Sequence, residues 1–250
     1  PTVIEGLGAT VIRNASGNLQ FPRISTKASG TGEGEADANA NSGLLMDTVS
    51  MTPERVSAKT TYTKQLILQG GVGIDTLIAN DLSAAMNAFI DDRAFDVILA
   101  DSDVDDQTTA GATNTTDFSA MAVAMEAAVL AAGGNMAAAR YAMSPKAYEL
   151  TKNAVAVTGV SALFENGQFN GFPATATPYL INNANAGEGQ VVYGNFAQGL
   201  LLCYFGGLDL LVDPYSAAGN AQVTLHANRF FDVAVRQPGA LSICTDLAAS

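Results

Sequence analysis

The feature that most constrains this chain lies in its first quarter, where two strand-like segments flank a stretch with almost no large side chains. Residues 31–43 read TGEGEADANANSG, a composition that cannot bury enough apolar area to offset the loss of chain entropy. Before it, residues 18–24 form a strand-like segment in which Pro22 confines the strand to an edge or a bulge. After it, residues 56–62 alternate with a period of two, typical of a half-exposed strand. Residues 21–62 therefore predict a long two-stranded extension.

Such an extension needs something to lie on. An isolated hairpin of two strands is only marginally stable in water. The first twenty residues offer little help, because they have the pattern of an extended arm with two glycines and no core of its own. We therefore expect a neighbouring subunit to support the extension.

The rest of the chain predicts a mixed structure. Apolar residues follow helical spacing over residues 74–95, and a second helix is expected over residues 117–132. Ser144 followed by Pro145 is typical of a helix start, which predicts a third helix over residues 146–153. Short apolar runs broken by Gly, Asn and Asp-Pro predict strands through most of the C-terminal half. The fold class expected is α+β.

Composition excludes several classes of protein. The 250 residues are 48% hydrophobic and 14% charged, which excludes a fully disordered chain. Twelve Lys and Arg residues oppose 24 Asp and Glu residues, giving a net charge of −12, and this argues against a protein that grips duplex nucleic acid. The longest apolar stretch, residues 199–212, is interrupted by Asp209 and is too short to span a bilayer. We expect no membrane partner.

The residues that commonly carry chemistry are few. His226 is the only histidine and is expected on a strand, exposed or hydrogen bonded. Cys203 and Cys244 are expected as buried thiols, and one histidine with two cysteines excludes a three- or four-ligand zinc site of these residue types within one chain.

An acidic segment, with Asp101, Asp103 and Asp105, resembles the start of a calcium-binding loop. That loop requires Gly and Glu where Asp106 and Ala112 stand, so we interpret the segment as a solvated acidic loop. Residues 70–73 (GGVG) lack the spacing of a phosphate-binding loop and predict a hinge. No constellation predicts a catalytic, cofactor-binding or metal-binding residue, and we expect neither an enzyme nor a cofactor.

Several segments, taken in order, resemble the major capsid proteins of tailed bacteriophages, which have the Hong Kong 97-type fold. The resemblance covers nearly the whole chain, with one departure: residues 99–102 (LADS) stand where the family often has a Gly-x-Gly turn. The segments that carry the resemblance are residues 21–24 (FPRI), 51–58 (MTPERVSA), 62–66 (YTKQL), the helix 74–95, 141–148 (YAMSPKAY), 168–173 (QFNGFP), 191–196 (VVYGNF) and 232–240.

This resemblance implies a division of the chain into four parts. They are an N-terminal arm (1–20), an extended loop (21–62), a peripheral domain (63–112 and 213–240, with a long spine helix at 74–95) and an axial domain (113–212 and 241–250).

The function implied is a structural one. Copies of the chain would self-assemble as hexamers and pentamers into the icosahedral head of a virion, enclosing double-stranded DNA without sequence-specific binding. Portal, scaffold and decoration proteins are the further partners that the resemblance implies. The charged residues of the extended loop are the expected intersubunit contacts: Arg23, Lys27, Glu33, Glu35, Arg55 and Lys59.

Other functions remain open at this stage. An encapsulin-like protein nanocompartment shares the fold, but such proteins usually begin with a helical cargo-binding segment, and this chain begins with an arm. An unrecognised soluble α/β enzyme is disfavoured because no nucleophile–His–acid pattern is present. A phage tail or surface-layer protein is disfavoured by the helical content.

Overall fold

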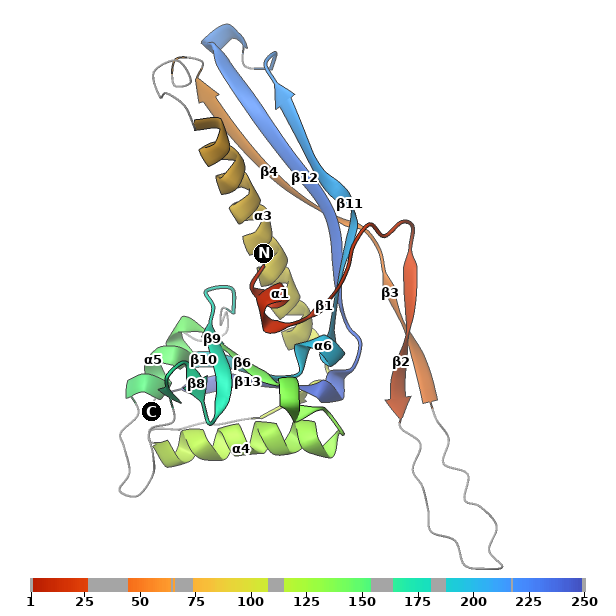
Figure 1. Ribbon diagram of the computed structural model, residues 1–250, viewed down its shortest axis with the longest axis vertical. Coiled ribbons are helices and arrows are strands. Elements are labelled where there is room, and N and C mark those ends of the chain that lie inside the picture. The colour runs from red at the N-terminus through yellow and green to blue at the C-terminus, as the bar shows by residue number, and fades with distance from the viewer. Residues whose placement is uncertain are drawn as a thin grey trace, which may run out of the picture.

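The computed structural model describes residues 2–26, 45–63, 65, 74–107, 115–153, 164–180, 188–216 and 218–248. These residues form a four-stranded sheet, a seven-stranded sheet and a separate two-stranded hairpin (Figure 1). The four-stranded sheet and the longest helix run along the long axis of the molecule, and the seven-stranded sheet lies at one end of them (Figure 1). This architecture confirms the expected α+β class.

The four-stranded sheet contains the longest strands. Its order is β1-β11-β12-β4. β12 is antiparallel to both β11 and β4, whereas β1 is a short parallel addition to β11. The strands are β1 (Thr10–Ile12), β4 (Glu54–Thr63), β11 (Leu200–Asp213) and β12 (Gln222–Val235).

The helix α3 (Ile74–Ala100) covers one face of this sheet along β12 and β4 (Figure 1). Its stripe of Leu82, Met86 and Ile90 is buried, in the same apolar cluster as Leu225 and Phe231 of β12. The helix predicted over residues 74–95 is confirmed and continues to Ala100, because the next turn also has buried positions. The hinge predicted at residues 70–73 lies outside the described residues.

The seven-stranded sheet has the order β5-β13-β10-β6-β9-β8-β7. Helix α4 (Thr115–Ala131) covers it, burying Phe118, Met125 and Val129 against strand residues that include Tyr141 and Tyr193. The strands are β5 (Asp105–Asp106), β6 (Arg140–Met143), β7 (Phe164–Glu165), β8 (Gln168–Phe169), β9 (Phe172–Ala176), β10 (Glu188–Gly194) and β13 (Leu241–Ala248).

The remaining helices are short. The predicted cap of the third helix is present: the hydroxyl of Ser144 accepts a hydrogen bond from the backbone N–H of Ala147 (3.1 Å) at the start of α5. These helices are α1 (Val3–Leu7), α5 (Pro145–Asn153) and α6 (Phe196–Gly199), with 3-10 turns at Met136–Ala138, Ala218–Asn220 and Pro238–Ala240.

The hairpin consists of β2 (Leu19–Thr26) and β3 (Leu45–Met51), which pair with each other and project beside the body of the molecule (Figure 1). This confirms a two-stranded extension, but its bounds differ from the expected 21–62. β4 does not belong to the extension, because it pairs with β12 from Glu54 to Thr63 and becomes an edge of the four-stranded sheet.

A second boundary also differs from the expectation. Residues 200–212 and residues 213–240 were expected in different domains, yet β11 pairs with β12 along its length, so both segments lie in the four-stranded sheet. The antiparallel register from Leu200–Val235 to Asp213–Thr224 requires this placement. The two cysteines are buried thiols as predicted, and His226 is a half-buried residue of β12.

Candidate functional site

The root of the hairpin is fixed by an apolar cluster on the face of β11 opposite to α3. Side chains alternate along β11, so that Leu200, Leu202 and Tyr204 face α3 while the intervening side chains face the hairpin. Met51 is fully buried against them. The cluster contains Met51, Leu201, Cys203, Phe205 and Ala234, with Leu19, Phe21 and Val49 packed against it.

The junction between β3 and β4 is held by Asp232 of β12. Its Oδ2 accepts a hydrogen bond from the backbone N–H of Thr52 (2.7 Å), and its Oδ1 accepts one from the N–H of Val233 (2.8 Å). Desolvation by burial raises the pKa of the Asp232 carboxyl above its ordinary value, although the two N–H groups oppose the shift. The carboxylate therefore orders the point at which the chain leaves the hairpin and enters the sheet.

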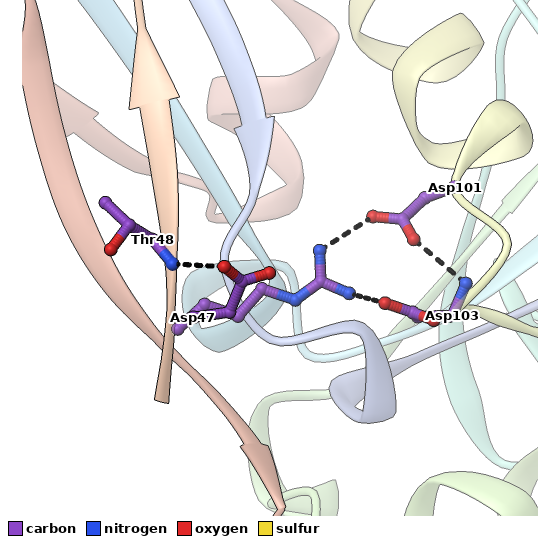
Figure 2. A network of polar contacts seen from close by, with 5 residues as sticks. Asp47, Thr48, Asp101 and Asp103 are labelled. Atoms are coloured by element: carbon purple, nitrogen blue, oxygen red, sulfur yellow. Dashed lines mark hydrogen bonds and ion pairs between the residues drawn. The ribbon is translucent and has the colours of Figure 1, made fainter. Parts of the chain in front are cut away.

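Further along the hairpin, Arg23 of β2 binds two aspartates at the end of α3 (Figure 2). One guanidinium nitrogen lies 3.4 Å from Oδ2 of Asp101, and the other contacts Oδ2 of Asp103. The backbone N–H of Asp103 donates to Oδ1 of Asp101 (3.0 Å), which holds the two carboxylates together. The Arg23 and Asp101 side chains are only 14% and 17% exposed, whereas Asp103 is 67% exposed. This contact, the hairpin clamp, therefore has one half shielded from solvent and one half open to it.

The clamp determines where the hairpin separates from the body. The next outward-facing residues, Ile24 in β2 and Met46 in β3, are 49% and 63% exposed. Asp47 lies opposite Arg23 in the hairpin register, and its carboxylate accepts from the N–H of Thr48 (Figure 2). Hydrophobic side chains beyond the clamp are therefore available to another surface.

The N-terminal segment is anchored by a buried aspartate of α3. The two carboxylate oxygens of Asp91 accept hydrogen bonds from the backbone N–H groups of Val3 (2.8 Å) and Ile4 (3.0 Å), at the start of α1. Asp91 is 2% exposed, and desolvation raises the pKa of its carboxyl. The contact satisfies helix N–H groups that have no partner within the helix.

Tyr204 of β11 lies at the centre of a second contact to the N-terminal segment. Its hydroxyl donates to Oε1 of Glu5 (3.2 Å), which Arg13 also contacts at 3.3 Å. The guanidinium of Arg229 stacks 3.7 Å from the centre of the Tyr204 ring. Desolvation is the main cause that raises the pKa of Tyr204 to about 12.

A partly buried polar network joins the seven-stranded sheet to Glu126 of α4. Oε1 of Glu126 accepts hydrogen bonds from the hydroxyl of Tyr141 (2.8 Å) and from Nδ2 of Asn170 (2.8 Å). Desolvation, followed by the charge of Glu126, raises the pKa of both Tyr141 and Tyr193. The hydrogen bonds from Tyr141 and Asn170 to Glu126 therefore join α4 to the sheet.

The four-stranded sheet leaves a wide surface uncovered. On β4, Arg55 and Lys59 are exposed, and neither forms an ion pair with another described residue. On β11, every residue from Gly206 to Val212 is exposed. The large apolar residues of this segment are Leu208, Leu210, Leu211 and Val212, each close to half exposed.

The exposed residues of β4 and β11 are suited to contact with another surface. Over the residues that the structure describes, no group of three His, Cys, Asp or Glu side chains is arranged to hold a metal ion. Within the same ranges, no helix is long and apolar enough to cross a membrane.

The six residues expected at intersubunit contacts have different surroundings. Arg23 is bound within its own chain by Asp101 and Asp103, because the hairpin root lies close to the end of α3. Arg55 and Lys59 are exposed on β4. Lys27, Glu33 and Glu35 lie outside the described residues.

Sequence reasoning missed three features of this surface. Asp101 and Asp103 were interpreted as a solvated loop, although they bind Arg23. Asp91 stands with Asp92 and Arg93 near the end of the expected helix, a pattern that indicates a solvated charged end, but the structure buries Asp91. The exposed apolar half of β11 was interpreted as an ordinary strand. The one sequence signal for the burial of Asp91 is its place near the apolar stripe of α3. The contacts of Arg23 and the exposure of β11 depend on how distant segments of the chain pack.

Comparison with known proteins identifies the family. The model of the phage capsid family matches residues 6–246, which is nearly the whole chain. This chain belongs to the phage capsid family. Among curated proteins, the major capsid protein of Halomonas phage phiHAP-1 is 26% identical over 252 residues, which cover 97% of this chain. The match spans 40% of that relative's length.

Solved structures show the same capsid fold. The capsid of an empty GTA particle has a TM-score of 0.71 at 17% identity, covering 96% of this chain and 88% of that one. A chain from Mycobacterium phage Ogopogo has a TM-score of 0.73 at 13% identity, covering 98% and 92%. The mature capsid of bacteriophage PhiM1 has a TM-score of 0.65 at 15% identity, covering 98% and 87%. The expected Hong Kong 97-type fold is therefore confirmed.

Proposed function

We propose that this chain forms the shell of a phage head: many copies assemble, as hexamers and pentamers, into an icosahedral container. The observation that carries the proposal is the hairpin, which leaves the body at the Arg23 clamp with Ile24 and Met46 exposed, in a chain matched by the phage capsid family over residues 6–246. A hairpin of two strands gains stability by lying on another surface. Copies of the same chain supply that surface in a symmetric shell.

The contacts between copies involve the charged residues of the expected loop. In this proposal Arg55 and Lys59 contact a neighbour directly from β4, and Lys27, Glu33 and Glu35 do so from the segment between β2 and β3. Arg23 contributes by directing the hairpin, since its guanidinium binds Asp101 and Asp103.

The shell encloses double-stranded DNA without sequence-specific binding and resides in the virion head, with portal, scaffold and decoration proteins as further partners. The net charge of −12 supports this part, because an acidic container does not bind tightly to DNA that must move during filling and ejection. The chain has no catalytic role in this proposal. A basic inner surface in the assembled shell would contradict the assignment of DNA to its interior.

Electron microscopy of the particle, paired with light scattering for its mass, tests the shell. Closed icosahedral shells of megadalton mass are expected, with DNA that resists added nuclease. A monomer or small oligomer under conditions of head production would contradict the shell. Closed shells that hold a protein cargo and lack protected DNA would instead indicate a nanocompartment.

The variant Arg55→Glu tests the contact surface. We expect a folded subunit with at least about tenfold fewer shells, because reversing the charge places like charges across a repeated contact. Arg55→Lys is the matched control and should assemble, since it keeps the charge. Normal shells from Arg55→Glu would remove Arg55 from the contact.

A further inference from the structure

We propose that the four-stranded sheets of neighbouring copies meet edge to edge, with β11 of one copy beside β4 of the next. In this arrangement the exposed edge of β11 is covered by a second copy of this chain, through the β4 edge that contains Arg55 and Lys59. This inference rests on the proposed shell function and names one of its contacts.

The outer edge of β11 is open along half of the strand. β1 pairs with β11 only from Leu201 to Cys203, and the N–H of Ala15 then donates to the carbonyl of Tyr204 (3.0 Å). Beyond that point no described strand lies along this edge. The change coincides with an irregularity between Phe205 and Asp209, where Gly206 has a φ of +78°. From there the strand continues as an exposed edge.

The open edge is unusually apolar. Exposed edge strands are normally protected from pairing by lysine, proline or a short length. This segment instead presents Leu208, Leu210 and Val212, and α3 leaves them uncovered because it packs on β12 and β4. An edge of this kind is a template for another protein surface.

The face of the sheet opposite to α3 has separated charges. Asp209 lies across from Asn228, which lies across from Ser57, and cross-strand partners share a face. Asp213 is on the same face as Asp209, four positions along β11, and Arg55 and Lys59 flank Ser57 on that face of β4. One edge of this face is therefore acidic and the opposite edge is basic.

The spacing of the two acidic residues along β11 matches that of the two basic residues along β4. β11 and β4 run in the same direction, because both are antiparallel to β12. Two copies placed side by side in one orientation would bring β11 next to the neighbour's β4 in a parallel arrangement. Because both pairs are separated by four positions, Asp209 can face Arg55 while Asp213 faces Lys59. Such a head-to-tail contact closes into a ring when its rotation permits.

The apolar side of the edge also has a counterpart on the neighbour. Phe89 of α3 is 45% exposed and lies one helical turn before Arg93, whose Nε is 3.4 Å from Glu54 of β4. The ring of Phe89 meets that of Phe231 of β12 edge-on, with the ring centres 6.2 Å apart, and Phe231 is the cross-strand partner of Glu54. With Asp209 beside Arg55 of the neighbour, Leu208 is level with Glu54, so Leu208 is the residue of the adjacent β11 that faces the exposed part of Phe89.

Asp209 is the better probe of the two acids. The carboxylate of Asp213 already accepts hydrogen bonds from the hydroxyl of Ser216 and from the N–H groups of Tyr215 (2.8 Å) and Ser216 (3.1 Å). These bonds, the hydroxyl first, lower the pKa of Asp213, and replacing this residue would also disturb the turn. Asp209 is exposed and forms no ion pair with any residue in the described ranges. Arg55 is its proposed partner.

A charge exchange between Asp209 and Arg55 tests the contact. Asp209→Arg and Arg55→Asp should each lower the yield of shells about tenfold or more, while the unfolding transition of the subunit is unchanged. The double variant should recover most of the wild-type yield, because the attraction is restored with reversed sign. Asp81→Arg, the same change at an exposed site on α3, is the control and should assemble normally. Two defective single variants without recovery in the double variant would overturn the pairing.

Cross-linking gives a second, independent readout. Shells assembled from equal parts of ¹⁴N- and ¹⁵N-labelled chain are treated with a carbodiimide, which joins amines to carboxylates in contact. Mixed-isotope peptides that join Lys59 to Asp209 or Asp213 are expected. Their absence from closed wild-type shells, or mixed-isotope peptides that place β11 beside a second β11, would overturn the inference and leave the shell function intact. Failure of the wild-type chain to form shells would contradict the proposed function itself.

Discussion

The carboxylate of Asp91 and the backbone N–H of Ile4 form a 3.0 Å hydrogen bond, although 87 positions of sequence separate the two residues. The same carboxylate also accepts the N–H of Val3 at 2.8 Å. One buried side chain of α3 therefore holds the start of α1, and through α1 it places β1 beside β11.

The anchor predicts the effect of removing the carboxylate. Asp91→Ala should lower the free energy of unfolding by about 1–3 kcal/mol, because two N–H groups lose their acceptor. Amides of residues 3–7 should exchange hydrogen faster, while those of α4 should not change. Asp92→Ala, at the adjacent half-buried position, is the control and should leave the exchange of α1 unchanged. Unaltered exchange in α1 of Asp91→Ala would show that the hydrogen bonds are dispensable.

Removing the hairpin clamp should loosen the attachment of β2 and β3 to the body of the molecule. Arg23→Ala should destabilise the attachment of β2 and β3 by about 1.5 kcal/mol, roughly a tenfold change in their opening equilibrium, because the charged hydrogen bonds to Asp101 and Asp103 are lost. Hydrogen exchange of residues 19–26 and 45–51 measures this opening. Arg13→Ala removes a largely exposed pair with Glu5 and should not affect the hairpin. Equal protection of the hairpin in wild type and Arg23→Ala would contradict the clamp.

The environment of Tyr204 predicts that the free energy of unfolding depends on pH in alkaline solution. Its folded-state pKa is raised to about 12 from an ordinary value of 10.0, so the folded state holds the proton more tightly than the unfolded state does. The resulting stabilisation is fully present below pH 10 and declines as the pH rises toward 12. The difference in unfolding free energy between wild type and Tyr204→Phe should therefore shrink over this interval. A difference that stays constant from pH 9 to pH 12 would be inconsistent with the buried phenol.

Substitution of Gly194, the last residue of β10, should be severely destabilising. Gly194 has a φ of +149°, and a Cβ added there would lie 2.1 Å from the carbonyl oxygen of Ala240. Gly194→Ala should lower the free energy of unfolding by about 3 kcal/mol or more, since the obstructing atom is backbone. Gly6→Ala has open space around the added methyl group and should be nearly neutral in urea unfolding. Comparable urea midpoints for the two variants would exclude the close approach of Gly194 to the carbonyl oxygen of Ala240.

Local patterns predicted a large share of the fold. The stripe of Leu82, Met86 and Ile90 predicted the long helix, and Ser144 with Pro145 predicted the start of α5, because periodicity and caps act over a few neighbouring residues. The composition of residues 31–43 predicted the two-stranded extension, and the order of motifs along the chain indicated the capsid fold, which the family match and the solved structures confirm.

The sequence predicted the candidate contact residues less well. The charge of Arg23 and its place in the extension predict an intersubunit contact, but charge alone does not determine which surface a guanidinium will reach. The same features predict contacts for Arg55 and Lys59, and the structure places both on an exposed edge. Asp209 gives no such signal, because within the sequence it only interrupts an apolar run.

Patterns in the amino-acid sequence predicted three helices, the two-stranded extension and the acidic net charge, because periodicity, caps and composition act within a segment or over the whole chain. They did not predict α1, since residues 1–20 have the pattern of an extended arm without a core, whereas Ile4 and Leu7 are buried. The family was indicated by the order of motifs that resemble it, and the match of the family model confirms it. Only the tertiary structure decided that β4 and β11 form opposite sides of one sheet, that Asp91 holds α1, and that Asp101 and Asp103 bind Arg23. Each of these contacts joins residues far apart in the chain, and its partner is selected by packing and by strand register, which no local pattern specifies.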